Sequence, residues 1–238
     1  MAEAAASIHM ASTNALHARA GARHARKIKA ARRKFLSYFP DGFRDEDYIE
    51  RGYKWEAHCQ WREALGQSTF KALLRQKRYE DIALRALRIE GRTNLIFSFE
   101  KMALRDGVRG AGAERFAKGL YAFLHGPGTP EKKFEKWVAA LSSLPRKQTR
   151  VVTWPVTTVF GFIAQPEQHI FIKPNVMRRA AEALDLSFDY ASRPNWQTYD
   201  SALKLARTLK RELRDLGARD MIDIQSFLWV QGSDEYPE

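Results

Sequence analysis

The chain has 238 residues, which is enough for one substantial core or for one core with a tail. Its 45% hydrophobic content, with six tryptophans and fourteen phenylalanines, excludes a largely disordered chain, because such large apolar side chains need burial. The formal net charge of +12 indicates an anionic partner; nucleic acid is the first candidate, and an anionic membrane or an acidic protein are the alternatives.

Cysteine, histidine and apolar runs exclude several other classes. The single cysteine, Cys59, cannot build a disulfide framework or a four-cysteine metal cluster, and it fits a reducing compartment. The six histidines show no metal-ligand spacing, and no glycine-rich phosphate loop is present. No apolar run approaches the roughly 18 residues that span a bilayer, and the N-terminus lacks the apolar core of a secretory signal. We therefore expect a cytoplasmic protein with no membrane partner, no metal and no cofactor.

The first forty residues differ in charge from the rest. After Glu3 no acidic residue occurs before Asp41, and the bases between them are Arg19, Arg23, Arg26, Lys27, Lys29, Arg32, Arg33 and Lys34. Several recur at helical spacing, so a basic helix could lie against phosphates; a flexible cationic tail and a transit peptide are the alternatives. The predicted organisation is a basic segment over 1–40 and a helical domain over 41–238, in one or two lobes.

Beyond Arg44, apolar residues recur at steps of three and four, which predicts an all-α fold. The expected helices cover 45–65, 70–89, 94–105, 114–124, 131–144, 151–164, 175–186, 198–216 and 219–230. Gly91 is expected to end one helix and Thr93 to cap the next, which is apolar on nearly all sides. The β-branched run over 151–164 predicts a buried helix that starts at Pro155, with a strand as the alternative.

The segment 144–186, LPRKQTRVVTWPVTTVFGFIAQPEQHIFIKPNVMRRAAEALDL, carries the most specific pattern of the chain. A Leu-Pro pair and a basic turn precede the buried helix, and a short extended run over 169–172 precedes a polar residue that opens the next helix. This order resembles the helix–hairpin–helix superfamily of base-excision DNA glycosylases. In that family a Leu-Pro-rich hairpin binds the DNA backbone, and an extended run ends at a catalytic aspartate.

Lys173 stands in the place of that aspartate, with Val176 and Arg178 at the matching offsets. The hairpin glycines of the family are also missing, and basic side chains stand there that could contact phosphates in place of backbone amides. The resemblance implies a double-stranded DNA partner. The candidate nucleic-acid-binding residues are Arg146, Lys147, Gln148, Arg150, Asn175, Arg178, Arg179 and Lys101.

Lys173 is the first candidate for the chemistry. Breaking an N-glycosidic bond builds positive charge on the sugar, which a carboxylate can stabilise, whereas a lysine with a lowered pKa can attack the sugar and form a Schiff base. Lys173 follows an apolar run and precedes a helix start, and both features disfavour its charged form. A plain phosphate contact at a helix N-terminus is the alternative.

Carboxylates and aromatic residues complete the candidate site. Glu100, beside Lys101 in an apolar helix, is either catalytic or part of an internal ion pair. Asp220 and Asp223 lie one helical turn apart and could face a site, although Asp220 is also placed to be an N-terminal charge on its helix. The candidates for stacking on a flipped base are Tyr190, Trp196 and Trp154, with core packing as the alternative.

The resemblance implies a DNA glycosylase that excises a modified base and leaves an abasic site. Because the active site departs from that of ordinary repair enzymes, prokaryotic glycosylases that attack modified phage bases are one class that it resembles. Two alternatives stay open: a non-catalytic DNA-binding protein, and a metal-dependent nuclease using Asp220, Asp223, Gln225 and Glu235 as ligands.

Overall fold

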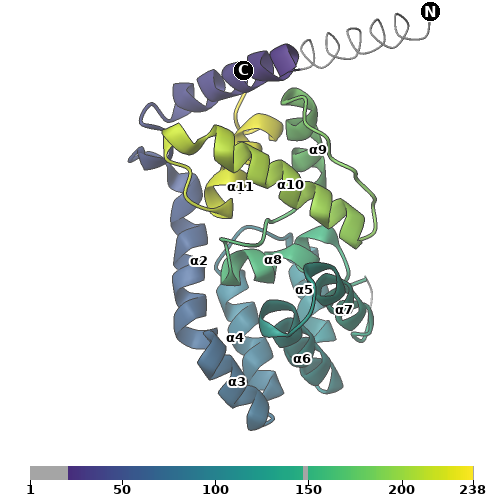
Figure 1. Ribbon diagram of the computed structural model, residues 1–238. Coiled ribbons are helices and arrows are strands. Elements are labelled where there is room, and N and C mark those ends of the chain that lie inside the picture. Colours follow the sequence, from purple (N-terminus) through teal and green to yellow (C-terminus); the bar gives the residue numbers. More distant parts are fainter. Residues whose placement is uncertain (1–20, 147–149, 238) are drawn as a thin grey trace, which may run out of the picture.

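The computed structural model describes residues 21–146 and 150–237, and every regular element in these two ranges is a helix. The predicted all-α fold class is thus confirmed for this part of the chain. Figure 1 shows the helices in two groups: α3 to α7 lie at one end, and α9 to α11 lie at the other with the first helix across them. Helices α2 and α8 connect the two groups.

The first group forms from amphipathic helices joined by short turns. Its members are α3 (Gln67–Arg75), α4 (Tyr79–Gly91), α5 (Ser98–Gly107), α6 (Ala111–His125) and α7 (Pro130–Ser142). The connecting helix α2 (Ile49–Leu65) comes before them and follows the 3-10 turn η1 (Gly42–Arg44). Helix α6 packs against α4 and α7, and its apolar face buries Phe116 and Leu120. At the α6–α7 contact Gly119 permits close approach, because a Cβ there would lie 2.5 Å from that of Ala140.

Helix α8 (Trp154–Ala164) lies between the groups, and all of its residues are buried. This confirms the predicted buried helix, which begins one residue before the expected Pro155. Thr153 caps it by accepting a hydrogen bond from the Val156 amide. The following residues 169–172 are extended but pair with no strand, and three of them are apolar and fully buried.

The second group consists of α9 (Pro174–Ala183), α10 (Trp196–Glu212), the 3-10 turn η2 (Arg214–Leu216) and α11 (Met221–Gly232). Helices α9 and α11 make the most extensive helix–helix contact of the described residues. Gly232 permits this contact, since a Cβ there would lie only 2.1 Å from the Val176 carbonyl oxygen. The start of α9, and with it Lys173, is therefore placed by close packing against α11.

The helix over 21–38 is tied to the second group by its charged and apolar faces alike. Arg23, His24 and Arg32 pair with Asp185, Glu212 and Asp215 respectively, and Phe35 is fully buried against Phe227. Arg23 stays exposed in spite of its ion pair, as do Arg26, Lys27, Lys29 and Arg33 on the same helix. Part of the basic segment thus holds the fold together, and its contact with phosphates stays a prediction; Arg19 lies outside the described residues.

Two expected elements differ. The helix predicted over 70–89 is divided into α3 and α4, because the backbone turns at Lys77, whose φ is 56°. The helix predicted over 94–105 begins only at Ser98, and its cap position is Phe97 rather than Thr93, whose hydroxyl donates instead to the Glu90 carbonyl. Phe97, Phe99 and Met102 are 52%, 54% and 58% exposed, so this apolar helix is not buried on all sides. No helix in the described ranges combines the length and apolar character needed to cross a bilayer.

Candidate active site

Lys173 occupies the N-cap position of α9 and lies between two aromatic rings. Its Nζ is 4.1 Å from the centroid of the Phe97 ring and 5.4 Å from that of Trp229, both within the range of a cation–π contact. The side chain is half-buried, and no described carboxylate forms an ion pair with it. The structure therefore holds an amine in an apolar setting without a fixed counter-ion.

The surroundings of Lys173 act on its pKa in opposite directions. Burial lowers the pKa below the ordinary lysine value, while the negative charges of Glu100 and Glu235 raise it, and burial has the larger effect. The positive end of α9 acts in the same direction as burial. The neutral amine is thus more accessible here than on an exposed lysine, as the sequence predicted.

Glu100 lies near Lys173 but its two carboxylate oxygens are already in use. One accepts a hydrogen bond from the Thr153 hydroxyl at 2.5 Å, and the other accepts from the Phe97 amide at 3.0 Å. Because Thr153 caps α8, this 4% exposed carboxylate ties the start of α5 to the start of α8. Glu100 consequently fixes the backbone that carries Phe97, which suits a positioning residue.

Two hollows open beside Lys173. A groove of about 620 Å³ is lined by Phe97, Pro155, Lys173, Asn175, Arg179 and Trp229. Next to it is a cavity of about 110 Å³, with room for about three or four waters. Its polar lining comes from Glu50, Lys54, Asn94, Gln225 and Glu235. Lys173 and Trp229 line both hollows, so they stand at the junction between a surface groove and a polar cavity.

The polar cavity contains groups that fix its shape and one group left unpaired. Lys54, 1% exposed, donates to Glu50 and to Ser226, and the other Glu50 oxygen accepts from the Tyr236 hydroxyl. Gln225 is 5% exposed, and its Oε1 has no hydrogen-bond partner among the described residues. Since buried polar groups are nearly always paired, this acceptor fits a ligand or an ordered water.

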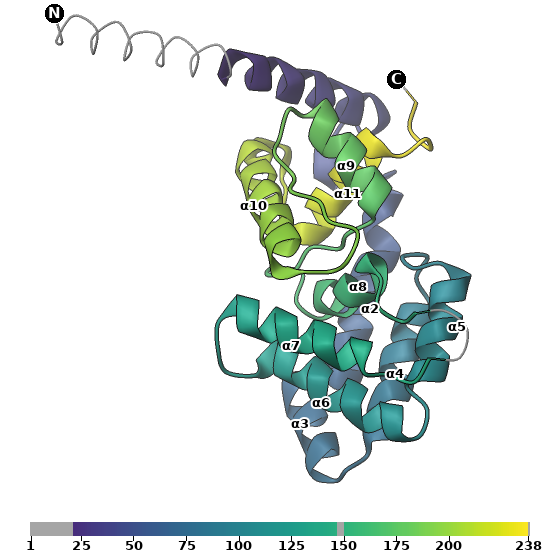
Figure 2. The same cartoon turned by 90° about the vertical axis from the view of Figure 1, so that its right-hand side faces the viewer.

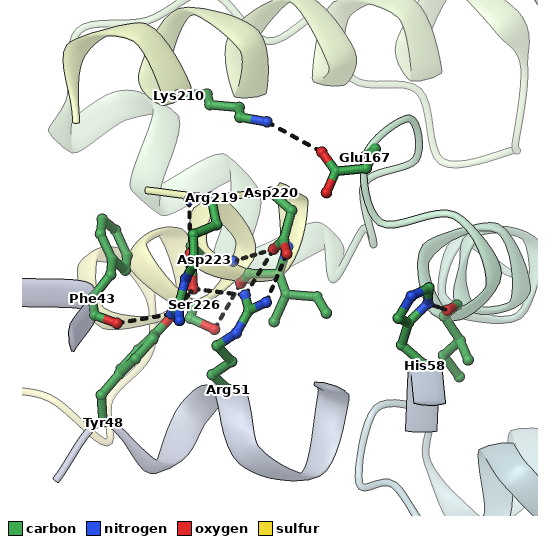
Figure 3. Close-up of polar contacts among 12 residues, drawn as sticks. Phe43, Tyr48, Arg51, His58, Glu167, Lys210, Arg219, Asp220, Asp223 and Ser226 are labelled. Carbon is green, nitrogen blue, oxygen red and sulfur yellow. Dashed lines mark hydrogen bonds and ion pairs between the residues drawn. The ribbon is translucent and has the colours of Figure 1, made fainter. Parts of the chain in front are cut away.

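Asp220 and Asp223 form a closed network rather than a lining of these hollows (Figure 3). Arg51 donates to both aspartates at 2.8–3.0 Å, and Arg219 donates to Asp223. Asp220 also caps α11 by accepting from the Ile222 amide at 2.9 Å. The two carboxylates are 1% and 0% exposed, so their oxygens are occupied by arginines and amides instead of facing a substrate or a metal ion.

This network is also separated from Lys173. Asp223 lies six residues before Trp229 on α11, which corresponds to about 9 Å along the helix. The structure thus brings together Lys173 and Glu100 of the predicted catalytic residues, and places Asp220 and Asp223 elsewhere. Within the described ranges, no three or more His, Cys, Asp or Glu side chains are grouped so that they could hold a metal ion.

Helix α9 presents its predicted nucleic-acid-binding residues on the surface. Asn175, Arg178 and Arg179 are exposed, and the Arg178 guanidinium lies 5.4 Å from the Tyr190 ring centroid. Arg179 pairs at 2.8 Å with Asp234 of the C-terminal segment. Tyr190 is half-buried beside a hollow of about 550 Å³ that Arg178 also lines. Asn175 and Arg179 also line the Lys173 groove, whereas Arg178 and Tyr190 line only this second hollow.

Two other aromatic candidates belong to the packing of the protein. Trp154 is 2% exposed and its indole nitrogen donates to the Ala191 carbonyl, which corrects the prediction that its ring stacks on a base: neither ring face is open. Trp196 is half-buried with its ring 6.1 Å from that of Phe134. Lys101 is also held internally, because its Nζ donates to the Thr93 carbonyl and pairs with Glu90.

The loop between α7 and α8 carries the remaining candidates. Arg146 and Arg150 are exposed, whereas Lys147 and Gln148 lie outside the described residues. The start of this loop is close to α5 and α6: a Cβ on Gly107 would lie 3.3 Å from that of Leu144, and one on Gly112 would lie 3.2 Å from the Pro145 ring. The described start of the predicted hairpin, Leu144 and Pro145, therefore lies next to the C-terminal end of α5.

Two residues of the site, Phe97 and Trp229, were missed by the sequence argument, and Glu235 was considered only as a metal ligand of the nuclease alternative. Trp229 and Glu235 come from α11 and the segment after it, more than fifty positions from Lys173. One signal was available for Phe97. Phe97 and Phe99 are two residues apart and cannot share one face of a helix, so at least one of them had to face away from the core.

Comparisons with known proteins add no evidence on the function of this site. No protein-family model, no curated protein and no solved structure matches this chain.

Proposed function

We propose that this protein is a DNA glycosylase in which Lys173 attacks the sugar of a nucleotide that has left the base stack. The observation that carries the proposal is the half-buried amine of Lys173, held between Phe97 and Trp229 at the junction of a groove and a polar cavity. Burial lowers the pKa of this amine, which favours the nucleophilic form.

The reaction follows from the chemistry of an amine at an N-glycosidic carbon. Neutral Nζ bonds to C1′, the bond from C1′ to the base breaks, and the base leaves with that electron pair and the proton that Nζ gives up. Opening of the sugar ring then places a double bond between Nζ and C1′, and the ring oxygen takes up a proton. Addition of water to this Schiff base returns the free lysine and leaves an abasic site.

The surrounding residues suit a base that has turned out of the helix. Aromatic rings on both sides of the amine offer stacking surfaces, and the adjoining cavity offers hydrogen-bonding groups for the edge of the base. The cavity is small, so a ring substituent or one edge of the ring fits within it while the rest lies in the groove. A DNA substrate also suits the strongly basic chain, because its net charge of +12 attracts the phosphate backbone. A modified base is our proposed substrate, because its loosened pairing lowers the energy of flipping.

The test uses duplexes that each carry one modified base, incubated with the full chain with and without EDTA. Alkali-labile abasic sites that form in EDTA support the glycosylase, whereas strand cleavage that EDTA abolishes supports the nuclease alternative. Binding without any product supports the non-catalytic alternative. Borohydride added during the reaction traps the Schiff base as a covalent protein–DNA adduct.

A matched pair of variants then tests the nucleophile. Lys173→Ala is expected to lose the trapped adduct completely. Lys204→Ala, which removes an exposed lysine of α10 paired with Asp200, is expected to trap as well as the natural protein. Full trapping by Lys173→Ala would show that another amine attacks the sugar.

A further inference from the structure

The exposed face of α5 combines features that rarely occur together on a surface without a partner. Phe99, Met102 and Arg105 follow at three-residue steps and lie on one side of the helix. Phe99 and Met102 are more than half exposed, and Arg105 is also exposed. Clustered large apolar side chains at the surface usually mark a contact site.

This face continues the Lys173 site without a break. The rings of Phe97 and Phe99 are stacked, with centroids 5.6 Å apart and planes 13° apart, and the Lys173 amine lies over the other end of this pair at Phe97. One aromatic surface therefore leads from the amine onto α5, which lies at the right-hand edge of the molecule in Figure 2. A strand whose base enters the groove has this surface as its nearest continuation.

Arginines lie at the far end of the same face. Arg88, Arg105 and Arg109 line a surface hollow of about 520 Å³ between α4 and α5, whose floor includes Val108 and the 54% exposed Leu84. Arg88 and Arg105 form no ion pair with a described residue, while Arg109 lies 3.6 Å from Asp106. The face thus changes from aromatic to cationic along its length.

We infer that the exposed face of α5 binds a short unstacked stretch of single-stranded DNA, with bases on Phe99 and Met102 and phosphates at Arg88 and Arg105; the inference rests on the proposed function of the Lys173 site. Stacking surfaces followed by cations are the features that hold single strands without sequence preference. The distance from Phe99 to Arg105 is about 9 Å along the helix, which is at most two to three nucleotides at the stacked spacing of about 3.4 Å and fewer in an unstacked strand. We name this surface, made by Phe99, Met102, Arg88 and Arg105, the α5 strand track.

The α5 strand track favours one form of DNA in the initial complex, before the proposed reaction begins. An intact duplex keeps its bases stacked and offers none to Phe99 or Met102, so the track favours duplexes that are locally opened, such as those with a mismatch, a bulge or a strand end. The substrate class is therefore a modified base within an opened duplex or a single strand.

The test measures affinity by fluorescence anisotropy, with a labelled single strand of unmodified bases and its matching duplex. Phe99→Ala/Met102→Ala is expected to weaken single-strand binding by about 5- to 150-fold, because one stacked base contributes about that much. Ile49→Ala, which removes another exposed apolar side chain (72% exposed) on α2, is the matched control and is expected to change nothing. Circular dichroism checks that both variants are folded.

A second variant tests the cationic half. Arg88→Ala/Arg105→Ala is expected to reduce the slope of log affinity against log salt by about 0.7 for each lost phosphate contact on a single strand. A folded Phe99→Ala/Met102→Ala protein that binds the single strand normally overturns the inference. So does polyglutamate that binds the natural protein as well as DNA does and loses affinity in the same variant, since the track would then fit an acidic protein.

Failure of the track and failure of the proposed chemistry are distinguishable. Lys173→Ala retains the α5 strand track and is expected to bind the single strand while trapping no adduct. If the natural protein releases no base yet loses single-strand affinity in Phe99→Ala/Met102→Ala, the chemistry is wrong and the track stands.

Discussion

The two ends of α11 hold charged side chains in opposite ways. At its N-terminal end, Asp220 and Asp223 are fully buried and each oxygen is matched by arginine or amide donors. Near its C-terminal end, Lys173 is half-buried against Trp229 and has no counter-ion among the described residues. Burial of a charge therefore does not by itself mark a functional site. A network in which every charged atom has a partner stabilises the fold, whereas a charged group without a partner is free to act on a ligand.

Breaking the ion-pair network around Asp220 and Asp223 should lower the stability of the protein more than any other change considered below. Arg51→Ala leaves Asp220 buried without its ion pair, and Asp223 keeps only Arg219. Removing one partner of a buried pair costs about 3–5 kcal/mol, so the free energy of unfolding measured in urea should fall by that amount at neutral pH. A loss below about 1 kcal/mol would mean that water already solvates these carboxylates.

Protonation of the buried His169 is expected to destabilise the folded protein in acid. Burial lowers the pKa of His169 to about 3, and its Nδ1 lies 2.9 Å from the Tyr199 hydroxyl. Between pH 6.5 and 3 the unfolded chain binds a proton here that the folded protein does not, so stability falls as the pH falls. The expected loss is about 1.5 kcal/mol between pH 6.5 and pH 5.

His169→Gln replaces the titrating group with a neutral one, so the free energy of unfolding should fall less steeply between pH 6.5 and pH 5. Urea unfolding of both proteins at a series of pH values measures the difference. An unchanged slope would show that protonation of His169 is not the source of the acid instability.

Replacing Lys173, which has no ion-pair partner among the described residues, should affect stability much less than replacing Arg51. Lys173→Met removes a half-buried charge that has no fixed partner, so the free energy of unfolding should change by less than about 1 kcal/mol. The same variant should lose the borohydride-trapped adduct. A stability loss as large as that of Arg51→Ala would make Lys173 a structural residue, and the contrast between the two ends of α11 would disappear.

The smallest expected effect concerns the pH dependence of trapping. The carboxylate of Glu235 raises the pKa of Lys173, although burial keeps the pKa below the ordinary lysine value. Glu235→Gln removes that charge and should move the midpoint of the trapping-rate profile to lower pH. Asp234→Asn is the control, because Asp234 pairs with Arg179 on the outer side of the same segment. A shift to higher pH in Glu235→Gln would contradict the assignment of the amine.

Local pattern was enough to predict most helices. The run over 151–164 is apolar almost throughout, which indicated a buried element, although its β-branched residues left a strand as the alternative to the helix. α6 ends at His125 and α7 begins at Pro130, each within one residue of the expected bounds, because glycine and proline at 126–130 interrupt the helical pattern. These features depend on neighbours within a few residues, which a single sequence contains.

The candidate site was predictable only in part, because its decisive contacts join distant segments. The sequence indicated Lys173 through the apolar run before it and the helix after it, but not the rings that flank its amine. It placed Asp220 and Asp223 one turn apart without showing that Arg51, some 170 positions earlier, closes around them. The apolar helix over 94–105 likewise gave no sign of which face would lack a partner in the fold.

The helix over 21–38 has a consequence for how the chain is made. Its partners are synthesised 188 to 200 positions later: His24 contacts Glu212, Gln231 donates to the Ala31 carbonyl, and Phe35 packs on Phe227. On the ribosome, this helix emerges long before its binding surface exists, with its apolar side uncovered and its bases unpaired. Contacts of such long sequence separation form slowly, so the helix docks only after α11 has been made. Until then the nascent chain carries an exposed, cationic, amphipathic helix that ribosomal RNA or a chaperone can bind.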